Sequence, residues 1–162
     1  MYYVAGALLL AQVGLMWVLD DSVDLEGLEY LAGAVWLVGV ALLVASILTL
    51  RHRGQASEGR SYVETEALIS TGVYGLVRHP LYLGWMVMYV AMVLLKPNWI
   101  LALAGITGSA CVYWIAVQEE VSLKEKFGAS YRRYMEAVPR FNLAAGAIRF
   151  LLRRRTDSRT SV

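Results

Sequence analysis

The sequence predicts an all-α polytopic membrane protein with four transmembrane helices and a cytoplasmic amphipathic C-terminal helix. Of its 162 residues, 58% are hydrophobic and 17% are charged, and the mean hydropathy is +0.51. The usual charged share is about 25%. A domain this small leaves roughly 30% of its chain surface exposed, so a soluble fold could not bury so much apolar surface. The length predicts one membrane-embedded domain, residues 1–162.

Four apolar runs without a formal charge supply the predicted spans. They are residues 2–19, 30–50, 81–95 and 98–117. A helix that crosses a bilayer needs about 20 residues, with a range of about 17–25. The backbone must be helical because hydrocarbon offers no hydrogen-bond partner to open N–H and C=O groups. Lys96 and Pro97 separate the last two runs, which predicts a helical hairpin.

The first run also has to be weighed against a cleaved secretory signal. No Lys or Arg precedes it, and an acidic stretch follows it where a small-residue cleavage site would be expected. We therefore interpret residues 2–19 as a span.

The distribution of charge predicts the topology. The loop 20–29 holds five acidic residues and no basic one. With four spans, the N-terminus, the loop 51–80 and the tail 118–162 lie on one side, together with fourteen of the fifteen Lys and Arg residues. Lys96 lies opposite. The positive-inside rule makes the basic side cytoplasmic, so both termini are expected there.

The tail contains a predicted amphipathic helix. Its apolar face is spaced i, i+4, i+8, i+11 and consists of Leu123, Phe127, Tyr131 and Tyr134. Gly128 interrupts this pattern and is expected to bend the helix, and Pro139 ends it.

A second tail segment follows. Residues 143–152 are apolar apart from Arg149 and are too short to cross a bilayer, which predicts an interfacial helix. Arg153, Arg154 and Arg155 come next. Such a cluster favours anionic lipid headgroups by roughly 1 kcal/mol per charge near the surface. Anionic lipids are therefore expected partners of the tail.

The remaining counts limit other kinds of site and partner. One cysteine, Cys111, excludes an intrachain disulfide and a four-thiolate metal site. Two histidines make a multi-histidine metal centre improbable, so no metal is expected. No nucleic-acid partner is expected, and the oligomeric state is left open.

The first polar cluster precedes the third apolar run. Residues 71–85 combine glycines, tyrosines, Arg78, His79 and Pro80. Pro80 suits the first turn of a helix, where its missing N–H is not needed. The free N–H groups of that turn favour a carboxylate or phosphate. The alternative is an interfacial anchor with a helix cap.

The second polar cluster is Gln118-Glu119-Glu120, directly after the fourth run. Carboxylates at a membrane edge are costly unless they are solvated, paired or functional. A solvated helix end, with Glu120 paired to Lys124 at i+4, is the alternative. The hairpin brings both clusters to the same bilayer face, which predicts one site with Arg78, Glu119 and Glu120 as candidate catalytic residues.

These two clusters resemble the isoprenylcysteine carboxyl methyltransferase family of integral membrane enzymes. The matching residues lie between Glu66 and Pro139. They are Ser70-Thr71-Gly72-Val73-Tyr74, Arg78-His79-Pro80-Leu81-Tyr82-Leu83-Gly84-Trp85, Glu119-Glu120-Val121-Ser122-Leu123, Phe127-Gly128, Tyr131, Tyr134 and Val138-Pro139. The order of these motifs is specific, although Arg-His-Pro alone would be weak.

The resemblance implies that S-adenosylmethionine is the methyl donor and that a lipophilic acceptor enters from the bilayer. The donor contacts implied by position are Glu66, Ala67, Leu68, Ile69, Tyr74, His79, Pro80, Leu81, Tyr82 and Glu119. Methyl transfer from a sulfonium depends on holding the two reactants in line and on excluding water. Trp85, Ile115 and Arg140 are the expected substrate contacts.

One departure affects the expected acceptor. The carboxyl methyltransferases carry an Arg one helical turn before the first Glu of the pair, facing the acceptor carboxylate, and here that position is Ile115. Phospholipid headgroup amines and small thiols therefore remain alternative acceptors. The sequence is also similar to NADPH-dependent sterol-type reductases, but Leu81 and Trp85 depart from their pattern. A non-catalytic membrane protein is the remaining alternative.

Overall fold

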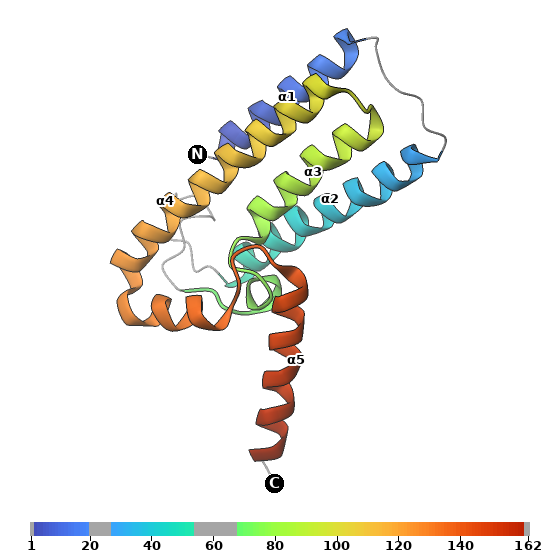
Figure 1. Cartoon of the computed structure of the whole chain (residues 1–162). Helices are drawn as coiled ribbons and strands as arrows, with labels where there is room; N and C mark the ends of the chain where they lie inside the picture. Colours follow the sequence, from blue (N-terminus) through green and yellow to red (C-terminus); the bar gives the residue numbers. More distant parts are fainter. Residues whose placement is uncertain (1, 20–26, 54–67, 161–162) are drawn as a thin grey trace. The chain divides into compact units, whose positions relative to one another are not determined.

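The computed structural model describes residues 2–19, 27–53 and 68–160, and its regular structure in these ranges is helical (Figure 1). The elements are α1 (Tyr2–Val18), α2 (Leu28–Arg53), the 3-10 helix η1 (Gly72–Gly75), α3 (Pro80–Leu95), α4 (Trp99–Ala137) and α5 (Leu143–Thr160). Each of the four apolar runs forms a helix, as predicted. The all-α class is confirmed for the described residues.

The chain divides into two compact units. The first comprises Met1–Val44 and Leu81–Glu119, and the second comprises Ala45–Pro80 and Glu120–Val162. The first unit therefore holds α1, α3 and the N-terminal parts of α2 and α4. The second holds η1, α5 and the remaining parts of α2 and α4.

In the first unit, α3 contacts each of the other three helices. Gly39 of α2 and Gly84 of α3 allow the closest approach, because a Cβ at Gly84 would lie 3.0 Å from the Gly39 carbonyl oxygen. Small residues commonly make such crossings between membrane helices. Tyr89 of α3 donates a hydrogen bond to the Ala5 carbonyl of α1 over 2.8 Å, and its ring packs against Gly108 of α4.

A buried amide joins three helices of this unit. Gln12 of α1 is 1% exposed. Its Nε2 donates to the carbonyl of Leu101 in α4 over 3.1 Å and to that of Tyr89 in α3 over 3.3 Å. At the end of the unit, Lys96 donates to the carbonyls of Met16 and Leu19. These polar contacts fix α1 against the α3–α4 hairpin.

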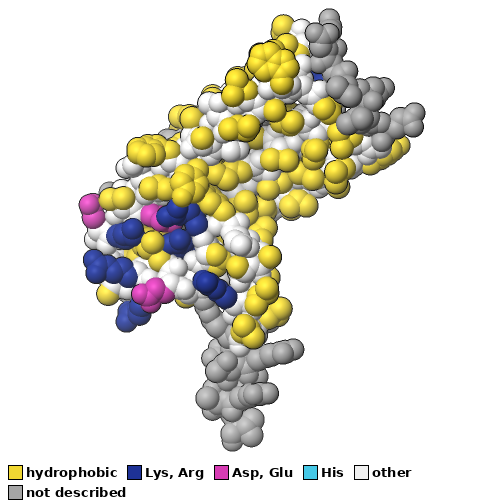
Figure 2. Space-filling model, in the orientation of Figure 1, with side chains coloured by type: hydrophobic (Ala, Val, Ile, Leu, Met, Phe, Trp, Pro, Cys, Tyr) yellow, Lys and Arg dark blue, Asp and Glu magenta, His cyan; other side chains and the backbone are white. Residues whose placement is uncertain are grey.

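The outward surface of the first unit is apolar. Two helices in the described ranges are long and apolar enough to cross a membrane, Leu28–His52 and Trp99–Ala137. Less than a third of the most apolar stretch of each helix is buried inside the protein, whereas the core helix of a soluble protein is mostly buried. Figure 2 shows hydrophobic side chains over the visible face of these helices. The shorter α1 and α3 leave the four-span topology a prediction.

The second unit is built around the C-terminal part of α4. Predicted face residues Tyr131 and Tyr134 are buried with Val138, and Leu123 and Phe127 pack partly buried against them. The predicted amphipathic face is therefore confirmed. Gly128 has φ 54° and ψ −125°, which interrupts the helical backbone at the predicted residue. The sequence predicted this segment as a tail helix separate from the fourth apolar run, whereas α4 continues from Trp99 past position 117 to the kink at Gly128 and resumes after it.

The two ends of the tail differ slightly from the prediction. α4 ends at Ala137, two residues before Pro139. α5 begins at Leu143 and continues to Thr160, beyond the apolar stretch 143–152. Asn142 caps α5, since its Oδ1 accepts a hydrogen bond from the Ala145 N–H over 2.9 Å.

Candidate functional site

Backbone hydrogen bonds join two segments of the second unit, Arg78-His79 before Pro80 and Pro139-Arg140 after α4. The Arg78 N–H donates to the Pro139 carbonyl over 2.9 Å, and the His79 N–H donates to the Arg140 carbonyl over 3.3 Å. Pro139 follows the end of α4, and Pro80 begins α3, as the sequence predicted. A residue before proline favours extended backbone, which suits His79 for this pairing. This backbone pairing brings the Arg78 and Arg140 side chains to the same carboxylate, that of Glu120.

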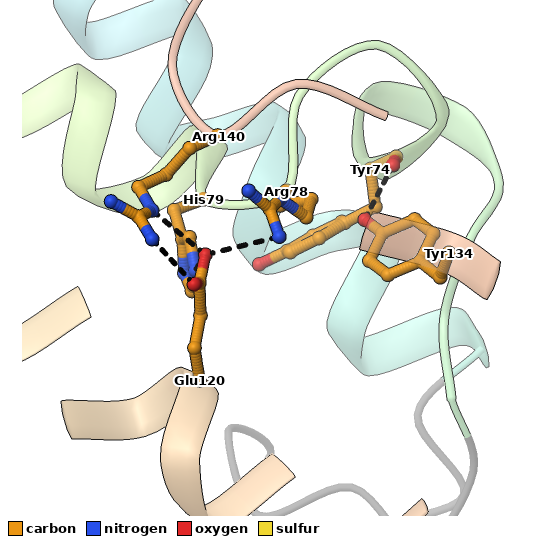
Figure 3. Close-up of polar contacts among 6 residues, drawn as sticks. All are labelled: Tyr74, Arg78, His79, Glu120, Tyr134 and Arg140. Carbon is orange, nitrogen blue, oxygen red and sulfur yellow. Dashed lines mark hydrogen bonds and ion pairs between the residues drawn. The ribbon is translucent and has the colours of Figure 1, made fainter. Parts of the chain in front are cut away.

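Glu120 lies between Arg78, His79 and Arg140 and is 1% exposed. Arg140 binds it with two hydrogen bonds, from Nε to Oε1 over 2.9 Å and from Nη2 to Oε2 over 2.7 Å. His79 Nε2 lies 3.2 Å from Oε1, and Arg78 Nη1 lies 3.3 Å from the same oxygen. Figure 3 shows these side chains converging on the carboxylate from separate parts of the chain.

The surroundings keep the Glu120 carboxyl ionised. Burial alone raises its pKa, but hydrogen bonds from His79 and Arg140 and the charge of Arg78 outweigh burial. Together they lower the pKa from 4.5 to about 2. A carboxylate held this way is a poor proton acceptor near neutral pH, because its oxygens already face cationic donors.

Arg78, His79, Glu120 and Arg140 form a cluster, called here the cationic cluster, that carries more positive than negative charge. Arg78 and Arg140 face one carboxylate, and the Arg78 side chain is only 9% exposed. In the described part of the chain, Arg78 Nε has no hydrogen-bond partner, and Nη1 reaches Glu120 as an ion pair outside hydrogen-bond geometry. A buried charge without full pairing is costly. The arrangement therefore suits an anionic group of a ligand.

Aromatic residues fix the loop that leads into Arg78. Tyr134 of α4 donates a hydrogen bond to the Tyr74 carbonyl in η1 over 2.6 Å (Figure 3). Burial raises the pKa of Tyr134, so the hydroxyl stays protonated and remains a donor. The Phe141 ring lies 5.9 Å from the His79 ring. These contacts hold the 74–79 segment against the end of α4 and the turn after it.

The other sequence-predicted site residues fall into three groups. Leu68 and Ile69 belong to the second unit, where Leu68 packs against the Tyr131 cluster and Ile69 is buried. Glu66 and Ala67 lie outside the described residues. Five further residues belong to the first unit, namely Leu81, Tyr82, Trp85, Ile115 and Glu119. Leu81 and Tyr82 are buried there, and Glu119 is half-buried.

Ile115 lines an open apolar groove in the first unit. The groove has a volume of about 620 Å³, and Val4 of α1 and Trp114 of α4 also line it. The predicted substrate position therefore lies in an apolar surface between two helices of that unit.

Two residues of the second unit make contacts that the sequence did not predict. Phe141 follows Arg140 directly, and its position after the Val138-Pro139 pair was the available signal. Gly146 packs so closely on the Leu76 carbonyl that a Cβ would collide with its oxygen. A glycine inside an otherwise helical apolar stretch was the signal for such an approach.

Comparison with known proteins places this chain among methyltransferases. The model of the phospholipid methyltransferase family matches residues 28–130, more than half of the chain. No curated protein and no solved structure gives a match. The matched region begins with α2 and includes Arg78, His79 and Glu120, whereas Arg140 and α5 lie beyond it.

The chain belongs to the phospholipid methyltransferase family. It is therefore a methyltransferase of a membrane-embedded family that depends on S-adenosylmethionine. The broader membrane methyltransferase identity predicted from the sequence is confirmed, and the narrower isoprenylcysteine subfamily is a resemblance of motifs.

Proposed function

We propose that this protein transfers a methyl group from S-adenosylmethionine to the amine of a phospholipid headgroup. The family match over residues 28–130 is the observation that carries this proposal. The uncharged side chain of Ile115 supports the proposal, because a carboxylate acceptor favours a positively charged residue at this position. The apolar groove around Ile115 offers surface for an acyl chain.

We propose that the cationic cluster binds the carboxylate of the methyl donor, S-adenosylmethionine. Arg78 has an unused, buried Nε donor, and Arg140 is partly exposed beside it. Charge-assisted hydrogen bonds from Arg to a carboxylate are strong and directional. Glu119 belongs to the first unit, and its contact with the donor's amino or ribose groups stays a proposal that rests on the sequence alone. The remaining donor contacts implied by the sequence, from Glu66 to Tyr82, stay proposals.

When bound, S-adenosylmethionine supplies a methyl group on a positively charged sulfur. Transfer would join this methyl carbon to the lone pair of the neutral headgroup nitrogen, leave the electrons of the carbon–sulfur bond on sulfur, and release one proton from nitrogen to water. Such an in-line displacement depends mainly on positioning. The protein's contribution is therefore to hold the two reactants and to keep water out.

Glu120 takes a positioning role in this proposal. The sequence suggested direct participation in the reaction, but both carboxylate oxygens are engaged by the cluster and the side chain is 1% exposed. It orients Arg78, His79 and Arg140 and leaves them a net positive charge. Arg78 and Glu119 remain the candidates for contact with the reactants.

The test is transfer of labelled methyl groups by the purified protein in lipid nanodiscs. Phosphatidylethanolamine, a farnesylcysteine analogue and a small thiol are offered as separate acceptors with labelled S-adenosylmethionine. We expect label on the lipid amine, loss of transfer in Arg78→Gln, and normal transfer in Arg132→Gln, an exposed arginine of the same unit. Label on the farnesylcysteine carboxyl or on the thiol, but not on the lipid, would reject the amine acceptor.

Position 115 gives a second arm to this experiment. Ile115→Arg introduces the charge that a carboxylate acceptor favours, so methylation of the farnesylcysteine analogue is expected to rise relative to the lipid. If the unmodified protein already methylates that carboxylate efficiently, the interpretation of Ile115 is wrong. NADPH is not expected to displace the donor, and displacement would favour the reductase alternative.

A further inference from the structure

The outward face of α5 is an exposed apolar stripe. Its residues follow the spacing i, i+3, i+4, i+7, i+8 and are Ala144, Ala147, Ile148, Leu151 and Leu152, all of them exposed. Ile148 is 59%, Leu151 is 60% and Leu152 is 57% exposed. This spacing lines one face of a helix. Large aliphatic side chains gathered on one exposed face indicate an interaction surface.

A different face of α5 fastens it to its own unit. Gly146 lies against the Leu76 carbonyl, and the Phe150 ring packs beside Gly75. Arg149 Nη1 also donates to the Glu136 carbonyl over 3.4 Å. At 100° per residue, Gly146 and Phe150 point away from the stripe. The stripe therefore stays outward while α5 keeps these contacts.

The length and charge of α5 identify what covers the stripe. The apolar stretch Leu143–Leu152 is too short to cross a bilayer and carries Arg149. The whole helix holds five arginines and one acidic residue, Asp157. A second copy would bring two strongly basic helices together, which like charges oppose. An anionic lipid surface matches both the apolar stripe and the arginines.

We infer that α5 lies in the membrane–water interface with its stripe among the acyl chains, and that its basic composition favours a surface of anionic headgroups. Gly146 and Phe150 join this helix to Gly75 and Leu76, only a few residues before Arg78. The lipid-bound helix therefore holds the loop that leads into the cationic cluster at the surface where lipids are present. This inference depends on membrane residence and is independent of which acceptor is methylated.

Spin labels in the full-length protein test the position of α5. Ile148→Cys, Leu151→Cys and Arg149→Cys are made separately in a Cys111→Ala background and labelled in nanodiscs that contain phosphatidylglycerol. Collision with oxygen reports contact with acyl chains, and collision with a water-soluble nickel chelate reports contact with water. At 148 and 151 we expect nickel collisions several-fold lower than at 149, with oxygen collisions correspondingly higher.

Two controls separate the competing outcomes. In nanodiscs of phosphatidylcholine alone, or when Arg153, Arg154 and Arg155 are all changed to Ser, the protection of 148 and 151 from nickel is expected to fall. Nickel collisions at 148 and 151 equal to those at 149 would overturn the inference. Low collision with both reagents, together with spin–spin broadening that disappears on dilution with unlabelled protein, would instead identify a second copy as the occupant. Failure of lipid methylation would leave this result unaffected.

Discussion

At the scale of single residues, Glu120 illustrates how a buried carboxylate can organise a site without reacting in it. Its oxygens gather Arg78, His79 and Arg140 from two segments that are far apart in sequence. Removing one partner of a buried ion pair commonly costs about 3–5 kcal/mol, because the other charges are left uncompensated. The carboxylate therefore matters both for folding and for the geometry offered to a ligand.

The pH dependence of stability follows from the lowered pKa of Glu120. A carboxyl with a depressed folded-state pKa contributes stability above its unfolded pKa of 4.5, and loses it as pH falls toward the folded value of about 2. The difference corresponds to about 3 kcal/mol. We expect the free energy of unfolding to fall by about this amount between pH 5 and pH 2, measured by denaturation in detergent micelles.

Glu120→Gln should remove this acid-sensitive part and lower stability at neutral pH by about 3 kcal/mol. Glu125→Gln, at an exposed position of the same helix, provides the matched control and should behave like the unchanged protein. An identical acid profile in Glu120→Gln would show that other groups govern acid unfolding.

Arg78 provides the prediction for donor binding. Its buried Nε is the proposed donor to the carboxylate of S-adenosylmethionine, and a hydrogen bond to a charged group contributes about 1.5–3 kcal/mol. Arg78→Lys keeps the charge but loses the planar guanidinium, so affinity should fall by roughly ten-fold to a hundred-fold. Calorimetry with the demethylated product, S-adenosylhomocysteine, measures this without turnover.

The matched control is Arg132→Lys, which should bind as the unchanged protein does. Equal affinity in Arg78→Lys and the unchanged protein, with both shown to be folded, would move the donor carboxylate to another part of the protein.

At the scale of elements, the fit of α5 against Leu76, the residue that follows η1, depends on the missing side chain of Gly146. A Cβ at Gly146 would collide with the Leu76 carbonyl oxygen, which is backbone and cannot rotate away. Gly146→Ala should therefore displace α5 and destabilise the second unit by about 1–3 kcal/mol. Thermal unfolding in micelles measures the change.

Gly14→Ala in α1 gives the contrasting case. A Cβ there would meet no described atom within 4 Å, so the better helix propensity of Ala should raise stability by up to about 1 kcal/mol. A neutral Gly146→Ala would show that α5 does not pack on Leu76 in the folded protein.

The elements also show where sequence reasoning succeeds. The start of α3 and the approximate end of α4 were predictable because Pro80 and Pro139 mark them, whereas α5 continues to Thr160, beyond its apolar stretch. The length of α4 was not predictable, since the charged residues after position 117 end the apolar signal without ending the helix. The ion-pair partners of Glu120 could not be predicted from the sequence either. Local spacing suggested Lys124, whereas Arg78 and Arg140 reach it through the backbone pairing of two distant segments.

At the scale of the whole molecule, the distribution of charge makes a topological prediction that helix length alone does not. α2 and α4 are long enough to cross a bilayer, and α1 and α3 are shorter. If only α2 and α4 crossed, residues 51–98 and the tail would lie on opposite sides, and the basic residues would be divided between them. With four spans, fourteen of the fifteen share one side, as the positive-inside rule favours.

Cysteine accessibility separates these two topologies. Ser22→Cys, Ser57→Cys and Ser158→Cys, each in a Cys111→Ala background, are exposed in intact cells to a maleimide that cannot cross membranes. Four spans with cytoplasmic termini predict labelling at 22 alone, with 57 and 158 reached only after permeabilisation. Two spans would place 22 and 158 on one side and 57 on the other. That second pattern would split the basic residues and leave the acidic loop beside the basic tail, so it would also remove the electrostatic basis for a cytoplasmic methyl-donor site.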